Sequence, residues 1–193
     1  MIGRTALHYL AVIFGVSAPQ TQTTQAEREM LCKFIPGRKH IVEVGVFEGF
    51  TTRLLATAAD ADAVVYGVDP FFSGRLGISW GELIAIAYNR RNIKNGKTRI
   101  IRKFSTEVTN EAPQVIDYVF IDADHSLAGI SADWAFWGAR LTSGGIIALH
   151  DTVVSPNSPN ELGSHQYFGS HIQHDPAFEI VGQQDCLSVL RKR

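Results

Sequence analysis

Short apolar runs alternate along the chain with longer segments of helical periodicity. The apolar runs lie at residues 41–44, 64–68, 99–102, 118–121 and 146–149, and helical patterns lie around 51–59, 80–93 and 126–139. This alternation is typical of βαβ crossovers, in which helices cover both faces of a parallel sheet. We therefore expect an α/β fold with a Rossmann-like, three-layer architecture.

The two ends of the chain depart from this alternation. Residues 178–181 and 187–190 are separated only by a polar turn, which predicts an antiparallel hairpin. Near the other end, the capping-box spacing of Thr24 and Glu27 predicts a helix that ends near Ile35, before Pro36-Gly37. The apolar run 6–16 is too short to span a bilayer, and we expect a buried helix there rather than a signal peptide. Residues 1–36 are thus expected to form a helical segment that caps the domain or forms an interface.

Composition and charge favour one globular domain, residues 1–193, with a small-molecule partner. The chain has 193 residues, of which 45% are hydrophobic, and its net charge of −1 provides no field that would attract nucleic acid or an anionic membrane. The two cysteines, Cys32 and Cys186, belong to no metal-binding or redox pattern. They are interpreted as buried thiols in a reducing compartment, so we expect a cytoplasmic protein. A homodimer formed through the N-terminal segment stays open.

A glycine turn follows the first predicted strand, in the segment VEVGVFEGFTT at 42–52. Gly45 and Gly49 allow a sharp bend and a close approach to a ligand, next to the positive N-terminus of the following helix. A dinucleotide fingerprint would have a glycine where this chain has Glu43. That carboxylate disfavours the pyrophosphate of NAD and favours a cationic ligand such as S-adenosylmethionine. Asp69 ends the next strand, where it can accept hydrogen bonds from ribose hydroxyls.

Polar residues also follow the fourth and fifth strands. The segment DYVFIDADHS contains Asp122, Asp124 and His125, and GGIIALHDT contains His150 and Asp151. Charges at the point where a buried strand emerges are costly unless they are used. Because ligands bind at the carboxyl ends of the strands in open α/β sheets, we expect these groups to converge near Gly45.

Taken together, EVGVFEG, GVD, FIDADHS and GGIIALHDT resemble the motifs of class I S-adenosylmethionine-dependent methyltransferases. The likeness is to the family-24 type, which is related to catechol and caffeoyl-coenzyme A O-methyltransferases, and it runs from about residue 40 to 152. The resemblance implies a seven-stranded sheet of order 3-2-1-4-5-7-6 with an antiparallel seventh strand. It also implies a cofactor site composed of Glu43, Gly45, Gly49, Thr51, Asp69, Pro70, Phe71, Ser105 and Asp122. For Phe71, packing in the core is the alternative.

In the metal-dependent relatives, carboxylates after the fourth and fifth strands hold a divalent cation such as Mg²⁺. The resemblance implies Asp122 and Asp151 as ligands. Where relatives carry a third aspartate or asparagine, this chain has His150 on one side of Asp151 and Thr152 on the other. We take His150 as the third ligand, which departs from the family pattern and favours a transition ion. Asp124 or His125 would act as the general base, and for His125 the alternative is a structural role, such as a helix cap.

The leading hypothesis is an O-methyltransferase that acts on a small hydroxylated metabolite. Two alternatives stay open. One is a metal-independent N- or C-methyltransferase, and the other is a catalytically inactive module that only binds the cofactor.

Overall fold

The computed structural model describes residues 4–74, 77–156 and 161–193, and these form one seven-stranded sheet. The strand order is β3-β2-β1-β4-β5-β7-β6. Strands β1 to β5 pair in parallel, whereas β7 is antiparallel to both β5 and β6. The strands are β1 (His40–Val44), β2 (Val64–Val68), β3 (Thr98–Ile101), β4 (Ile116–Ile121), β5 (Leu141–Leu149), β6 (Phe178–Gln184) and β7 (Leu187–Lys192). The predicted strand order and the closing hairpin are both confirmed.

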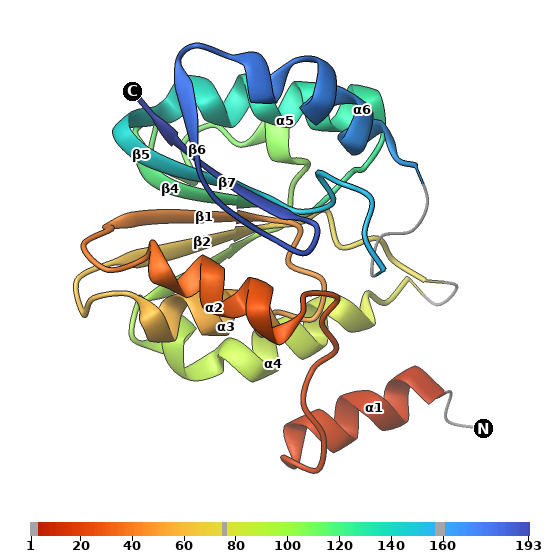
Figure 1. Ribbon diagram of the computed structural model, residues 1–193. Coiled ribbons are helices and arrows are strands. Elements are labelled where there is room, and N and C mark those ends of the chain that lie inside the picture. Colours follow the sequence, from red (N-terminus) through yellow and green to blue (C-terminus); the bar gives the residue numbers. More distant parts are fainter. Residues whose placement is uncertain (1–3, 75–76, 157–160) are drawn as a thin grey trace.

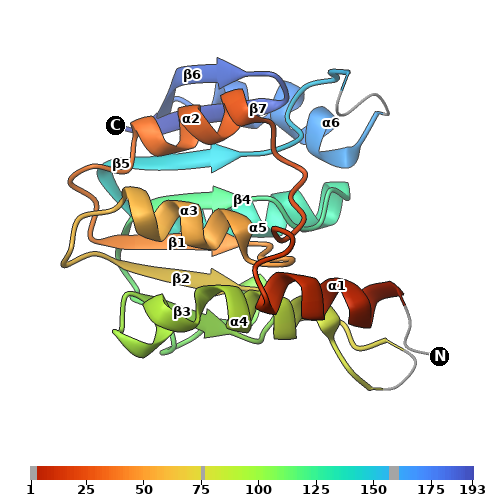
Figure 2. The same ribbon diagram turned by 90° about the horizontal axis from the view of Figure 1, so that it is seen from below.

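Helices cover both faces of the sheet (Figure 1). One layer contains α2, α3 and α4, and the opposite layer contains α5 and α6. A second view, turned by 90°, shows α1 beside α4 (Figure 2). The helices are α1 (Arg4–Ile13), α2 (Gln25–Lys33), α3 (Phe50–Ala58), α4 (Trp80–Lys94), α5 (Leu127–Arg140) and α6 (Gly163–Ser170), with short 3₁₀ turns at Ser105–Glu107 and Ile172–His174.

The alternation of side chains along β1 assigns its residues to the two layers. Ile41 belongs to the apolar cluster on the side of α2 and α3, whereas Val42 and Val44 belong to the cluster on the side of α5. Because successive strand residues face opposite sides, Glu43 faces α3 and its carboxylate accepts a hydrogen bond from Thr52. Each layer thus closes over its own half of the core.

The helix starts follow the local signals in the sequence. Thr24 caps α2 and forms the predicted capping box with Glu27, and Ser79 and Ser126 cap α4 and α5. Helix α2 ends at Lys33, two residues before the predicted end, and β5 begins at Leu141, five residues earlier than predicted. Of the two predicted buried thiols, Cys186 is buried, whereas Cys32 is only partly buried.

The N-terminal helix differs from the expectation of a buried helix. Val12 is buried, but Leu7 of α1 and Phe14 and Val16 just after it are 55%, 77% and 80% exposed, because α1 packs mainly against α4. Within the described residues no helix combines the length and the apolar character needed to cross a membrane. The loop predicted from Val153 to about Asn160 lies partly outside the described residues.

Candidate functional site

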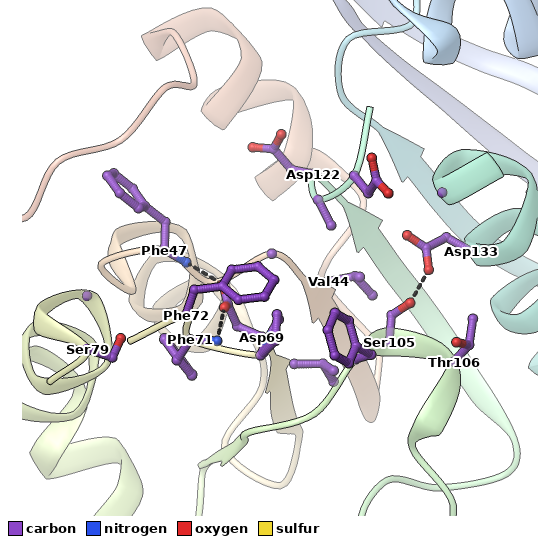
Figure 3. Close-up of a pocket in the computed structure, with 18 of the residues that line it drawn as sticks. Val44, Phe47, Asp69, Phe71, Phe72, Ser79, Ser105, Thr106, Asp122 and Asp133 are labelled. Atoms are coloured by element: carbon purple, nitrogen blue, oxygen red, sulfur yellow. Dashed lines mark hydrogen bonds between the residues drawn. The ribbon is translucent and has the colours of Figure 1, made fainter. Parts of the chain in front are cut away.

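A pocket of about 820 Å³ opens at the carboxyl ends of β1, β2 and β4. Figure 3 shows most of its residues, which come from the turns after these strands, from the segment after β3, from the start of α4 and from α5. Six of the nine residues that were predicted to bind the cofactor line it, namely Gly45, Asp69, Pro70, Phe71, Ser105 and Asp122. The predicted convergence of the strand ends therefore takes place.

Gly45 forms the tightest contact of this turn. Its φ of +91° is a conformation that L side chains rarely adopt, and a Cβ added there would lie 1.9 Å from the carbonyl oxygen of Asp122. The backbone of Asp122 and Ala123, just after β4, is therefore too close to admit any side chain at Gly45. This glycine is required for the first strand to turn beside the pocket.

Asp69 fixes the shape of the turn through three backbone N–H groups. Its Oδ2 accepts hydrogen bonds from Val46 N at 2.9 Å and Phe47 N at 3.0 Å, and its Oδ1 accepts one from Phe71 N at 2.7 Å. Figure 3 shows the bonds from Phe47 and Phe71. Each carboxylate oxygen can accept more than one hydrogen bond, so Asp69 can shape the turn and still bind hydroxyls in the pocket. The sequence predicted only the second of these roles.

The lining of the pocket also includes a polar pair and two aromatic rings. Ser105 Oγ donates a hydrogen bond to Asp133 of α5 (Figure 3), and burial raises the pKa of the Asp133 carboxyl. The rings of Phe72 and Phe104 meet edge to face with centroids 5.9 Å apart, although both side chains are largely exposed. The sequence analysis missed Asp133, Phe72 and Phe104. A charged residue within an otherwise buried helical stripe was the available signal for Asp133.

Three of the predicted cofactor residues lie outside the lining of the pocket. Glu43 is 1% exposed beneath the turn, and its pKa is raised well above the ordinary value, by burial first and then by Asp122 and Asp69. Its Oε1 has no hydrogen-bond partner among the described residues. Gly49 packs against α4, and Thr51 is buried in α3. Contact of these three residues with a cofactor stays a prediction.

Phe71 packs in the core, which was the alternative for this residue, and contact of its ring with the cofactor stays a prediction. Its side chain is 3% exposed and packs with Val46 and Ala85 in a small apolar cluster, yet it also lines the pocket. Its φ of +47° is unusual for a residue with a large side chain. The turn after β2 therefore places the ring against the core while leaving one side toward the pocket.

The three predicted metal ligands lie close together, and one of them, Asp122, also lines the pocket. Nδ1 of His150 lies 3.3 Å from Oδ1 of Asp122 and 3.2 Å from Oδ2 of Asp151. Donor atoms around an octahedral cation with bonds of 2.0–2.1 Å are about 3 Å apart, so these separations match such a site. A φ of +50° at Asp151 turns the chain sharply after β5 and accompanies this convergence. The geometry and the donor set therefore fit a divalent ion.

The two candidate bases differ in their surroundings. His125 is partly exposed, and its Nε2 lies 3.4 Å from Asp151 Oδ2 and 3.9 Å from Asp122 Oδ1. Asp124 lines the pocket, but its Oδ1 accepts a hydrogen bond from Ser126 N and its carboxylate packs against Gly129. His125 is thus a fourth side chain beside the candidate metal ligands, whereas Asp124 stabilises the start of α5.

A buried carboxylate that the sequence analysis did not select lies behind His150. Glu27 of α2 is fully buried, and its Oε2 lies 3.3 Å from Nε2 of His150. Burial alone would lower the pKa of His150, but contacts with Asp122, Asp151, Cys186 and Glu27 raise it far above the ordinary value. Each ring nitrogen of His150 therefore faces at least one carboxylate. Capping-box spacing was the only sequence signal at Glu27, and it gives no indication of this contact.

Comparison with known proteins agrees with this architecture. A model of a family described as a methyltransferase domain, family 24, matches residues 42–152, more than half of the chain. The O-methyltransferase from Bacillus cereus in complex with SAH is 17% identical, with a TM-score of 0.68 over 99% of this chain and 91% of the other. The O-methyltransferase TomG from Streptomyces achromogenes, involved in tomaymycin synthesis and in complex with SAM, is 12% identical, with a TM-score of 0.65 over 98% and 90%.

A third similar structure is the cofactor-bound Rv0187 from MTB, which is 17% identical with a TM-score of 0.66 over 99% of this chain and 90% of the other. No curated protein matches the sequence. At these identities the solved structures establish the shared fold, and the family match establishes membership. The chain therefore belongs to family 24 of the class I S-adenosylmethionine-dependent methyltransferases.

Proposed function

We propose that the protein is an O-methyltransferase that transfers a methyl group from S-adenosylmethionine to a hydroxyl of a small molecule. The observation that carries the proposal is the pocket at the strand ends, which contains the glycine turn, Asp69 and Asp122. His150 lies behind this pocket, 3.3 Å from Asp122 and 3.2 Å from Asp151. The glycine at position 45, where no side chain can be placed, and the carboxylate of Asp69 fit a nucleoside cofactor with ribose hydroxyls. The bound cofactor would supply a methyl group already activated by the sulfonium.

The residues of the chain would then align the acceptor and remove its proton. We propose that Asp122, His150 and Asp151 hold a divalent cation, which would lower the pKa of the acceptor hydroxyl. We propose His125 as the base, because its Nε2 lies 3.4 Å from Asp151 Oδ2 and its side chain is partly exposed. The hydrogen bond from Ser126 N to Asp124 supports a structural role for that carboxylate instead.

Calorimetry with S-adenosylhomocysteine tests the cofactor. We expect saturable binding with one site per chain, and an absence of heat at millimolar concentration would refute the proposed function. His125→Ala is expected to lower kcat by on the order of 10²–10⁴-fold while leaving cofactor affinity unchanged, because a general base contributes about that much. If Asp124→Asn gave the larger loss of kcat, Asp124 would be the base.

A metal-independent methyltransferase is the second candidate, and His150 favours it. The positive charge that its raised pKa implies would lie between Asp122 and Asp151 and would offset their charges without a cation. A chelator distinguishes the two candidates in a methyl-transfer assay with phenolic and sugar hydroxyl acceptors. Activity that disappears with EDTA and returns with Mg²⁺ or Mn²⁺ supports the metal site, whereas activity that persists supports the second candidate.

A further inference from the structure

A buried hydrogen-bonded cluster links α2 and the β6–β7 turn to the candidate metal site. It consists of Glu27, Cys186 and His150, whose ligand atoms lie within 4.8 Å of one another. Glu27 and Cys186 both lie outside the segment 42–152 that the family model matches. The cluster is separate from the pocket, since neither Glu27 nor Cys186 lines it.

The carboxylate of Glu27 has a full set of partners. Its Oε1 accepts hydrogen bonds from Cys186 N at 3.1 Å and from Cys186 Sγ at 3.0 Å. Its Oε2 accepts one from Thr24 N at 2.8 Å and lies 3.3 Å from Nε2 of His150. A buried carboxylate with bonds from two separate segments of the chain has a fixed position. It therefore offers His150 an acceptor that does not move.

His150 is held with its two nitrogens facing different groups. Nε2 faces Glu27, and Nδ1 faces Asp122 and Asp151. When one ring nitrogen of a histidine donates to a carboxylate, the other can present its lone pair to a metal, and the carboxylate fixes both the tautomer and the ring orientation. The side chain is only 4% exposed, so the ring is largely shielded from bulk solvent.

From this arrangement we infer that Glu27 is a positioning residue, which keeps the proton on Nε2 of His150 and thereby presents Nδ1 to a divalent cation shared with Asp122 and Asp151. This inference rests on the metal site of the proposed function. The site thus depends on α2, an element that precedes the first strand and is 123 residues away from His150 in the sequence.

The experiment uses the full chain and measures Mn²⁺ binding by electron paramagnetic resonance of the free ion. Glu27→Gln is expected to weaken Mn²⁺ binding by roughly 10- to 100-fold, the range found for such outer partners of metal ligands. Thr24→Val is the matched control, because it removes the other half of the capping box and leaves the carboxylate facing His150. We expect its Mn²⁺ affinity to stay within about threefold of the wild type.

A double mutant guards against a merely structural effect of Glu27→Gln. If Glu27 acts through His150, adding Glu27→Gln to His150→Ala will not weaken Mn²⁺ binding further. A further loss of similar size in that background would overturn the inference, as would a Glu27→Gln affinity within threefold of the wild type. Failure of the wild type to bind Mn²⁺ would also overturn it.

Nitrogen-15 NMR of the His150 side chain gives a readout independent of activity and of the metal. In the metal-free wild type we expect Nε2 to be protonated, and an unprotonated Nε2 would refute the positioning role. S-adenosylhomocysteine binding separates this inference from the proposed function. Glu27→Gln should retain cofactor affinity, whereas a wild type that binds Mn²⁺ but no S-adenosylhomocysteine would refute the methyltransferase proposal and leave the role of Glu27 intact.

Discussion

Gly45→Ala tests whether the backbone at the first glycine turn shapes the pocket. The substitution combines two costs. An alanine at a φ of +91° loses about 1–2 kcal/mol because its Cβ crowds the carbonyl oxygen that follows. The new Cβ would also lie 1.9 Å from the oxygen and 2.7 Å from the carbon of the Asp122 carbonyl, and backbone atoms cannot rotate away as a side chain can.

To restore ordinary contact distances, the ends of β1 and β4 must separate by more than about 1 Å. Overpacking of this kind typically costs about 1–3 kcal/mol, so the total loss in unfolding free energy is roughly 2–5 kcal/mol. For a chain of this size, 1 kcal/mol lowers the melting temperature by about 2–4 °C. The same separation displaces Asp122, which lines the pocket and lies beside His150.

Gly96→Ala provides the matched control. Gly96 has a φ of +78°, but a Cβ there meets nothing within 4 Å. Gly96→Ala should therefore lower the unfolding free energy only through the unfavourable backbone conformation, by about 1–2 kcal/mol. In thermal unfolding, the melting temperature of Gly45→Ala should be well below that of Gly96→Ala. Calorimetry should find S-adenosylhomocysteine affinity reduced at least tenfold only in Gly45→Ala. Equal stability and equal affinity in the two variants would refute the argument.

Three further outcomes follow from the site. Asp69→Asn should lower the unfolding free energy by about 1–3 kcal/mol and weaken S-adenosylhomocysteine binding, because an amide has one acceptor oxygen for the three N–H groups that now donate to the carboxylate. Chemical denaturation measures the first effect and calorimetry the second. Asp122→Asn should weaken Mn²⁺ binding in the resonance assay by more than Asp124→Asn does, and the reverse order would contradict the assignment of ligands. Burial raises the pKa of Glu27, but hydrogen bonds with His150, Cys186 and Thr24 lower it overall from 4.5 to about 2. The stabilisation of the fold by the ionised Glu27 carboxylate is therefore complete above pH 4.5 and lost as the pH falls toward 2. In denaturant titrations, the difference in unfolding free energy between the wild type and Glu27→Gln should shrink across that range. A difference that stays constant would argue against this role of the carboxylate.

The sequence by itself determined the architecture. Alternation of apolar runs with helical patterns, the caps at Thr24 and the polar turn of the closing hairpin are local signals, and the structure follows them. The convergence of Asp69 and Asp122 was also predictable, because a parallel sheet brings the carboxyl ends of its strands to one edge. These features depend on periodicity and chain direction, which a linear sequence contains.

Tertiary structure decided which atoms meet. The side of the sheet that Glu43 faces depends on strand phase, and only the packed α3 places it against Thr52, away from the pocket. Glu27 contacts a histidine 123 residues away and a cysteine 159 residues away, and no local pattern encodes such a contact. The exposure of α1 was likewise undetermined, because an apolar run shows that a segment can be buried but not whether a partner surface is available. Local propensities fix the elements, whereas the pairing of side chains from distant elements depends on how those elements pack.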